Sequence, residues 1–364
     1  MMLGSAITRF DKHTLMVMAG GTGGHVYPAM AVADYLKAHG WNIVWLVTAG
    51  GMENRLIEGK GYSTATITMR GVRGKGLVGW LLLPIKLVTA FKQAWQAIRM
   101  HQPNVVLGMG GFAAFPGGAM AKLLGKPLVI HEQNSVAGLT NKVLSLLADR
   151  VLVAFPKVLG EQAQLVGNPV RDALAELAPP HARYAKHQGR LKVLVVGGSL
   201  GAAALNEVLP KAIANMPEAL RPEVIHQAGE KHIAALQANY QQAGVQAETV
   251  AFIHDMATVY QWADVVVCRA GALTVAELAC VGVASVLVPF PFAVDDHQTT
   301  NAQYLVDAGA AMLIQQTALS VGKATEILSN LTREQCLDMA VRARQLAKPQ
   351  ATATVAKICM ELAL

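Results

Sequence analysis

The sequence predicts an α/β protein built from two doubly wound parallel sheets, and three observations support this prediction. Apolar runs typical of buried strands alternate with segments of helical periodicity along most of the chain. A strand, a glycine-rich turn and a helix start follow one another at residues 15–36, and the same pattern returns at 191–209. The length of 364 residues also exceeds what one ordinary hydrophobic core supports. We therefore expect two domains of similar construction.

Composition narrows the class of protein. No run reaches the roughly 18–20 apolar residues of a membrane-spanning helix, and charged residues at 9–13 stand where a signal peptide has its apolar core. We therefore expect a cytoplasmic protein. The four cysteines lack paired spacing, which predicts neither a disulfide framework nor a zinc site. The formal net charge of +7 favours an anionic partner.

The expected elements divide at a polar, proline-containing connection at residues 166–190. Before it, strands are predicted in the opening segment and near 41–48, 62–68, 104–109, 127–131 and 150–154. A helix over 80–101 carries an apolar face of Leu83, Leu87, Val88, Phe91, Trp95 and Ile98. After the connection, strands are predicted near 191–196, 223–226, 247–252, 264–268, 285–289 and 311–314, followed by alanine-rich helices from Val321. Parallel pairing places ligands at the carboxyl ends of these strands.

The first glycine-rich turn, Gly20 to His25 (GGTGGH), predicts a phosphate site, because glycines expose successive N–H groups beside the positive end of a helix. Val26 stands where a dinucleotide fingerprint has its third glycine, and no P-loop Lys-Ser/Thr follows. A tight turn without a ligand is the structural alternative. His25 lies where the helix dipole favours a neutral imidazole, so it is either a general base or a ring that only holds the loop.

A second cluster, residues 264–277 (DVVVCRAGALTVAE), allows two interpretations that are compatible with each other. Thr274 and Glu277 match a capping box. Alternatively, the N–H groups near Leu273 and Thr274 bind a diphosphate while Glu277 accepts from ribose hydroxyls. The later segment Asp295 to Gln298 lacks the spacing of a metal site, so no metal is expected, and Gln298 suits sugar hydroxyls.

A basic and apolar block at residues 70–92 has the composition of a segment that lies in a membrane interface. A core helix with a charged edge is the alternative. Nucleic acid is disfavoured, because no stacking aromatics are interleaved along a basic groove. The residues that we expect to contact a membrane are Arg73, Lys75, Leu77, Trp80 and Leu81.

Six motifs, taken in order, resemble the bacterial MurG family over nearly the whole chain. They are MVMAGGTGGHVYPA, VLGMGGFAAFPG, IHEQNSVAGLTNK, VGNPVR, VLVVGGSLGA and WADVVVCRAGALTVAELA. The resemblance implies a GT-B fold, with an acceptor- and membrane-binding domain at 1–168, a UDP-GlcNAc-binding domain at 169–346, and a last helix at 347–364 that packs back on the first domain. It also implies a peripheral enzyme at the cytoplasmic face of the inner membrane that uses no cofactor.

The implied reaction is an inverting transfer of N-acetylglucosamine from UDP-GlcNAc to the C4 hydroxyl of undecaprenyl-pyrophosphoryl-MurNAc-pentapeptide (lipid I), which gives lipid II. His25 is the candidate base. The resemblance places these further residues at the substrates: Thr22, Gly23, Gly24, Asn134, Arg171, Ser199, Ile253, Ala272, Leu273, Thr274, Val275, Ala276, Glu277 and Gln298. The alternatives are a UDP-GlcNAc epimerase of the same fold, a non-catalytic nucleotide-sugar sensor at the membrane surface and a nicotinamide oxidoreductase.

Overall fold

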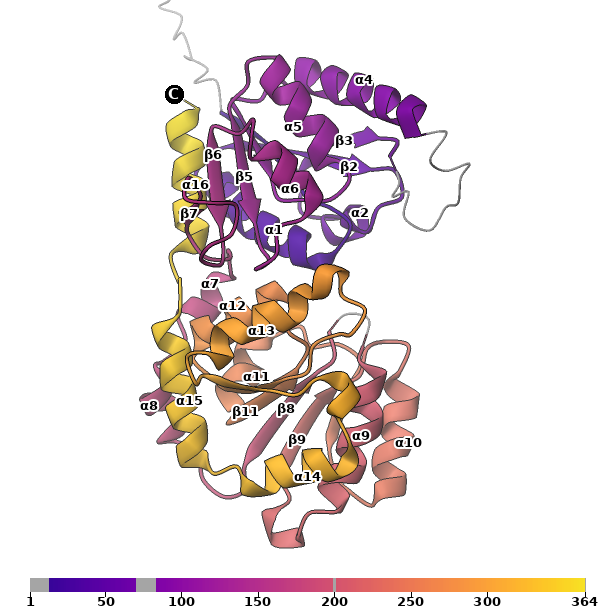
Figure 1. Cartoon of the computed structure of the whole chain (residues 1–364), viewed down its shortest axis with the longest axis vertical. Coiled ribbons are helices and arrows are strands. Elements are labelled where there is room, and N and C mark those ends of the chain that lie inside the picture. The colour runs from indigo at the N-terminus through magenta and orange to yellow at the C-terminus, as the bar shows by residue number, and fades with distance from the viewer. Residues whose placement is uncertain (1–12, 70–82, 199–200, 364) are drawn as a thin grey trace, which may run out of the picture.

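The computed structural model describes residues 13–69, 83–198 and 201–363, which form two α/β units, one above the other in Figure 1. The first unit contains a parallel sheet in the order β3-β2-β1-β4-β5-β6-β7. Its strands are β1 (Thr14–Met18), β2 (Asn42–Thr48), β3 (Ser63–Ile67), β4 (Val105–Gly108), β5 (Leu128–Glu132), β6 (Arg150–Val153) and β7 (Gln164–Leu165). Only β7 was not predicted, because two exposed residues carry no strand periodicity.

Helices cover both faces of this sheet. They are α1 (Gly23–Ala38), α2 (Met52–Leu56), α4 (Leu83–His101), α5 (Ala114–Leu123) and α6 (Leu139–Leu144). Alternate residues of β1 enter different cores: Leu15 and Val17 pack beneath α1, whereas Met16 and Met18 pack on the side of α4 and α5. Burial on both faces explains why this strand is an unbroken apolar run in the sequence.

The second unit contains a parallel sheet in the order β10-β9-β8-β11-β12-β13, and its six strands confirm the sequence prediction. The strands are β8 (Lys192–Val196), β9 (Glu223–Gln227), β10 (Glu248–Val250), β11 (Val265–Cys268), β12 (Ala284–Leu287) and β13 (Ala311–Leu313). The helices around them are α9 (Ala203–Ala214), α10 (Ile233–Ala243), α11 (Met256–Trp262), α12 (Ala272–Val281), α13 (His297–Val306), α14 (Val321–Asn330) and α15 (Arg333–Gln345).

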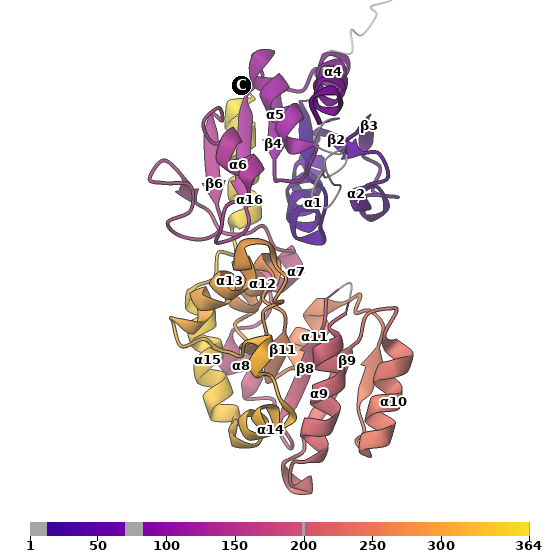
Figure 2. The same cartoon turned by 45° about the vertical axis from the view of Figure 1, so that its right-hand side comes forward.

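Two short helices, α7 (Asp172–Ala175) and α8 (Pro180–Tyr184), lie in the connection between the sheets, and the chain crosses back at its end. The last helix, α16 (Ala351–Leu362), runs up the side of the first unit in Figures 1 and 2. Its Val355 and Cys359 are buried in the same core as Leu15 and Val17. Thr352 Oγ1 also donates a hydrogen bond to the carbonyl of Val170, 3.0 Å away, which ties α16 to the connection.

Both sheets have a switch point. The strands that follow the first strand in the sequence are added on one side of it, and the later strands are then added on its other side. In the first unit this point lies between β1 and β4, and in the second between β8 and β11. Ligands of doubly wound sheets bind in the crevice that opens at the carboxyl ends of these strands. Helix α1 of the first unit contacts α12 of the second, so the two crevices lie on facing sides of the boundary between the units.

The exposed side of α4 differs from the apolar face predicted for residues 80–101. Ile98 is buried together with Ala90, Ala94 and Ala97, whereas Val88 and Trp95 are 68% and 41% exposed. The prediction missed this because small alanines, rather than the larger apolar residues, face the sheet. Within the described ranges, no helix combines the length and apolar character needed to cross a membrane.

Candidate active site

The turns after β1 and β4 touch directly at the first switch point. Gly110 and Gly111 both have positive φ, at +97° and +92°. A Cβ on Gly111 would lie 2.6 Å from the carbonyl oxygen of Gly20, so only glycine permits this approach. The glycine clusters that stand 90 residues apart in the sequence (Gly20–Gly110) thus form one platform beside the start of α1.

His25 is the third residue of α1, and its ring is fixed by the platform. Its Nδ1 lies 3.0 Å from the carbonyl oxygen of Gly20. Because a carbonyl oxygen only accepts hydrogen bonds, Nδ1 carries the proton in the neutral form of the ring, and the lone pair of that form is on Nε2. A Cβ on Gly110 would lie 3.2 Å from Nε2, so the absence of a side chain there leaves space at the basic nitrogen. The half-buried ring can therefore both hold the loop and accept a proton.

At the second switch point, α12 begins with unpaired N–H groups that can bind an anion. The first hydrogen bond inside the helix runs from Val275 N to the carbonyl of Gly271, so the N–H groups of Ala272, Leu273 and Thr274 precede it. The residue at the N-cap is Gly271, and no side chain caps the helix. The capping-box interpretation of Thr274 and Glu277 is therefore wrong, because Thr274 already lies inside the first turn.

Glu277 lies one turn further along α12, with only 7% of its surface exposed. Its Oε1 accepts a hydrogen bond from Nη2 of Arg171 at 3.1 Å, and its Oε2 accepts one from the hydroxyl of Tyr260 at 3.3 Å. Burial raises the pKa of Glu277, and the ion pair with Arg171 offsets part of this effect. Since the Arg171 side chain is 52% exposed, it can leave Glu277 when a hydroxyl-bearing ligand arrives.

The remaining predicted residues lie on loops around these two points. Gln298, near the start of α13, accepts hydrogen bonds from the N–H groups of Ala270 and Phe290, which leaves its Nε2 to donate. Ile253 follows β10 and is half-buried. Asn134 follows β5, and its Oδ1 accepts from Nδ2 of Asn301 at 3.4 Å. Ser199 lies outside the described residues, as do Arg73, Lys75, Leu77, Trp80 and Leu81.

Sequence reasoning missed the polar residues that join the two units. Asn301 of α13 is fully buried and accepts hydrogen bonds from both N and Oγ of Ser135, at 2.9 and 2.8 Å. Asn168 donates to the carbonyls of Gln133 and Ala272, which belong to different units. The motif Gly167-Asn168-Pro169 was the available signal, but its sequence alone did not show that both units would close on it.

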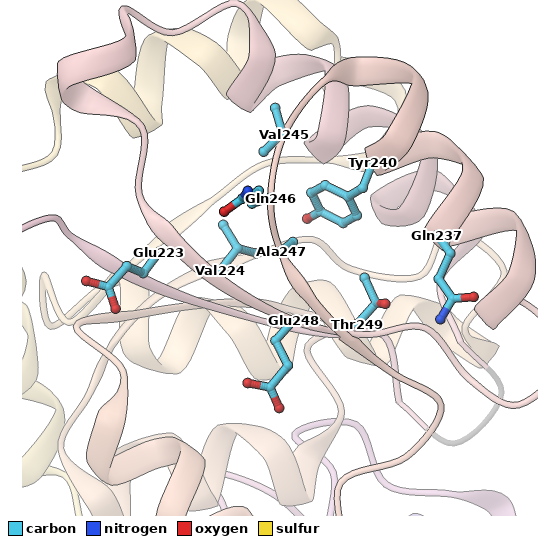
Figure 3. A pocket seen from close by; sticks show the side chains of 9 residues that line it. All are labelled: Glu223, Val224, Gln237, Tyr240, Val245, Gln246, Ala247, Glu248 and Thr249. Atoms are coloured by element: carbon cyan, nitrogen blue, oxygen red, sulfur yellow. The ribbon is translucent and has the colours of Figure 1, made fainter.

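Figure 3 shows a groove that does not fit an anionic ligand. It lies where β9 and β10 begin, at the end of the sheet opposite the switch point. Two carboxylates, Glu223 and Glu248, stand at its edge, and no lysine or arginine lines it. The facing crevices, rather than this groove, are therefore the candidate active site.

The fold and the site together define a glycosyltransferase of the GT-B class. A histidine with a basic nitrogen lies on one unit, and an open helix N-terminus with a buried carboxylate lies on the other. The model of the glycosyltransferase family 28 N-terminal domain matches residues 15–153, and that of the family's C-terminal domain matches residues 192–357. The chain therefore belongs to glycosyltransferase family 28 and, within it, to the MurG enzymes, as the following relatives establish.

Two curated relatives of this chain share the name UDP-N-acetylglucosamine--N-acetylmuramyl-(pentapeptide) pyrophosphoryl-undecaprenol N-acetylglucosamine transferase. The protein from Nitrosospira multiformis is 56% identical over 353 residues, which cover 96% of this chain and 99% of the relative. The protein from Aromatoleum aromaticum is 58% identical over 350 residues, covering 96% and 98%. The crystal structure of Acinetobacter baumannii MurG is 41% identical with a TM-score of 0.85, covering 96% and 99%. Membership of this family excludes the nicotinamide oxidoreductase.

Proposed function

We propose that this enzyme transfers N-acetylglucosamine, with inversion, from UDP-GlcNAc to the C4 hydroxyl of undecaprenyl-pyrophosphoryl-MurNAc-pentapeptide, giving lipid II. The observation that carries the proposal is the placement of His25 Nε2 on one side of the boundary and the uncapped start of α12 on the other. The names of the full-length relatives support the same two substrates and favour the transferase over the epimerase and the sensor.

The second unit binds the donor in this proposal. The N–H groups of Ala272, Leu273 and Thr274, with Val275 and Ala276 beside them, receive the diphosphate at the positive end of α12. Glu277 accepts from the ribose hydroxyls once Arg171 has turned away toward the phosphates. The backbone at Ile253 meets the uracil, and Ser199, which follows β8 in the sequence, contributes to the same site. Gln298 Nε2 and Asn134 bind the sugar hydroxyls, while Thr22, Gly23 and Gly24 border the sugar and diphosphate.

The chemical step is a single displacement at the anomeric carbon. The C4 oxygen of the acceptor forms the new bond while its proton passes to Nε2 of His25, and the bond from the anomeric carbon to the diphosphate breaks. The electron pair of that bond leaves with UDP, so negative charge grows on the diphosphate oxygens. N–H groups that are already oriented at the start of α12 stabilise this charge without needing a metal. Attack opposite the leaving group converts the α-linked donor into a β-1,4 product.

The first unit also docks on the anionic cytoplasmic face of the inner membrane in this proposal. Exposed residues of α4 at spacings of three and four form one stripe: Ile85, Val88, Lys92, Trp95 and Arg99. Apolar side chains mixed with basic ones are typical of helices that lie in a lipid interface. The stripe follows directly after the predicted membrane-contact residues Arg73 to Leu81 in the sequence.

Replacing Val88 by glutamate is expected to lower binding to anionic vesicles about tenfold or more, because each buried methylene contributes roughly 0.8 kcal/mol and a like charge repels the surface. Sedimentation with phosphatidylglycerol–phosphatidylethanolamine vesicles measures the bound fraction. Leu220→Glu is the matched control, since Leu220 is 52% exposed and belongs to the second unit. Equal vesicle binding by both variants and the wild type would contradict the proposal that α4 contacts the membrane.

Acceptor-dependent release of UDP separates the proposed transfer from its alternatives. With EDTA present, UDP should appear only when both UDP-GlcNAc and a short-chain lipid I analogue are added. An epimerase would act on UDP-GlcNAc without the lipid, and a sensor would bind the nucleotide sugar without releasing UDP. Either of those two results would contradict the proposed function.

A further inference from the structure

Glu53, near the start of α2, is a buried carboxylate without a cationic partner. Its side chain has no exposed surface. Of the three other buried acids, Asp264 and Glu277 pair with Arg333 and Arg171, whereas Glu132, like Glu53, has no lysine or arginine partner among the described residues. An ion removed from water costs free energy unless donors surround it. The hydrogen-bond donors around the Glu53 carboxylate must therefore stabilise its charge, and they show which parts of the chain it is connected to.

Three hydrogen bonds reach the Glu53 carboxylate, two from the last residue of β2 and one from the turn after β1. Oε1 accepts from the N–H of Thr48 at 2.8 Å and from the Thr48 hydroxyl. Oε2 accepts from the N–H of Gly21 at 3.3 Å. Burial alone opposes ionisation, but these hydrogen bonds outweigh it and lower the pKa of Glu53. The group is therefore a carboxylate at neutral pH.

The Gly21 N–H belongs to the peptide group whose carbonyl holds His25. The carbonyl oxygen of Gly20 accepts the Nδ1–H of His25 at 3.0 Å, and the N–H of the same peptide group donates to Glu53. A single planar, conjugated amide thus lies between the carboxylate and the imidazole. A Cβ on Gly20 would lie 2.8 Å from the Glu53 carboxyl carbon, so a larger residue at this position would displace the carboxylate.

We propose that Glu53 is a positioning residue that acts on His25 through the Gly20–Gly21 peptide group, as a carboxylate–peptide–histidine relay. The proposal rests on the proposed function, in which His25 is the base. A carboxylate that accepts from an amide N–H makes the amide oxygen a stronger acceptor, because hydrogen bonds in a chain polarise one another. The stronger oxygen holds the Nδ1–H tautomer and stabilises the imidazolium that forms during the reaction.

Only one proton moves in the step that the relay assists. The C4 hydroxyl of the acceptor gives its proton to Nε2, Nδ1 keeps its own, and the peptide N–H and Glu53 exchange nothing. The arrangement corresponds to the partners that fix the ring orientation and tautomer of functional histidines elsewhere, with an amide inserted between carboxylate and ring. A carboxylate that only fastened the two turns together would leave the tautomer of His25 unchanged when its charge is removed.

Glu53→Gln tests the relay, because glutamine keeps the shape and one acceptor oxygen but removes the charge. The 15N spectrum of the histidine rings, with His25 assigned by a His25→Ala variant, reports the tautomer directly and needs no turnover. We expect Nδ1–H in the wild type and an increased Nε2–H population in E53Q. The kcat of E53Q should fall about tenfold to a hundredfold, by analogy with the outer-shell partners of metal-ligating histidines, while the KM for UDP-GlcNAc stays unchanged.

Two control variants distinguish the effect of removing the charge of Glu53 from the effect of disturbing the local structure. Glu58→Gln makes the same substitution at an exposed position just after α2, and it should change neither the spectrum nor kcat. Thr48→Val removes a hydrogen bond to Glu53 but keeps its charge, so it should lower stability while leaving the tautomer and kcat near those of the wild type. If T48V changed the tautomer and kcat as much as E53Q does, the role of Glu53 would be structural only, and the relay would be overturned.

The remaining outcomes also decide the proposal. An unchanged tautomer and kcat in folded E53Q would overturn it, as would an Nε2–H tautomer in the wild type, which is measurable even if E53Q fails to fold. A wild-type protein that holds the Nδ1–H tautomer but transfers no sugar would contradict the proposed function instead.

Discussion

Replacing His25 by alanine is expected to lower kcat by about 10²–10⁴-fold, the usual contribution of a general base. The affinity for UDP-GlcNAc should change by less than about twofold, because the proposed donor contacts lie mainly on the second unit. The physical reason is the fixed tautomer: Nδ1 is bound to the carbonyl of Gly20, which leaves Nε2 as the basic nitrogen beside Gly110. Steady-state kinetics with both substrates, together with calorimetric titration of the donor, measures the two effects separately.

His39→Ala is the matched control for this variant. His39 caps the other end of α1 and likewise has its Nδ1 at a carbonyl oxygen, that of Tyr35 at 2.8 Å, but it is exposed and away from both crevices. A third variant, His25→Asn, can still donate to Gly20 but has no basic nitrogen. If H25N turned over like the wild type, His25 would be a structural residue and the assignment of the base would be lost.

Replacing Glu277 by alanine is expected to weaken UDP-GlcNAc binding by about 10–150-fold, because a hydrogen bond to a charged group contributes roughly 1.5–3 kcal/mol. The buried hydroxyl of Tyr260 also loses its acceptor, so a lower melting temperature should accompany the loss of affinity. Calorimetric titration with UDP-GlcNAc measures the affinity, and thermal unfolding measures the cost to the fold.

A modified donor shows whether the lost affinity comes from the ribose. The 2′-deoxyribose analogue of UDP-GlcNAc should bind the wild type more weakly than the natural donor, whereas E277A should bind both equally. Discrimination that survives in E277A would place the ribose away from Glu277. Glu277→Gln keeps the shape beside Tyr260 and is the control for damage to packing.

The sequence allowed much of the fold to be predicted because its signals are local. Apolar runs mark strands that are buried on both faces, as in β1 and β11, and the glycine turns at Gly20 and Gly197 lie at the two switch points. The helix start after Gly271 was likewise visible from its turn, although the capping box proposed there was wrong, since a pattern of residue types does not fix the first helical residue.

Most of the features that could not be predicted from the sequence depend on contacts between residues far apart in the chain. In the sequence, Glu53 is an ordinary polar residue of a short helix. Only the packing of α2 against Gly20 and Gly21 makes it part of the site. Asn301 belongs to a polar segment, and its burial arises because two units that are separate in the sequence close on it. The stripe on α4 was hidden because alanines, which carry little hydrophobic signal, form its buried side.

The structure of the product tests the central claim most directly. UDP-GlcNAc with a 13C-labelled sugar and a short-chain lipid I analogue are incubated with the enzyme in detergent and EDTA, and the product is examined by NMR. The proposed reaction gives one new β-linkage from the labelled anomeric carbon to C4 of the muramic acid. A product with an α-linkage, attachment at another hydroxyl, or labelled sugar that stays on UDP would contradict it.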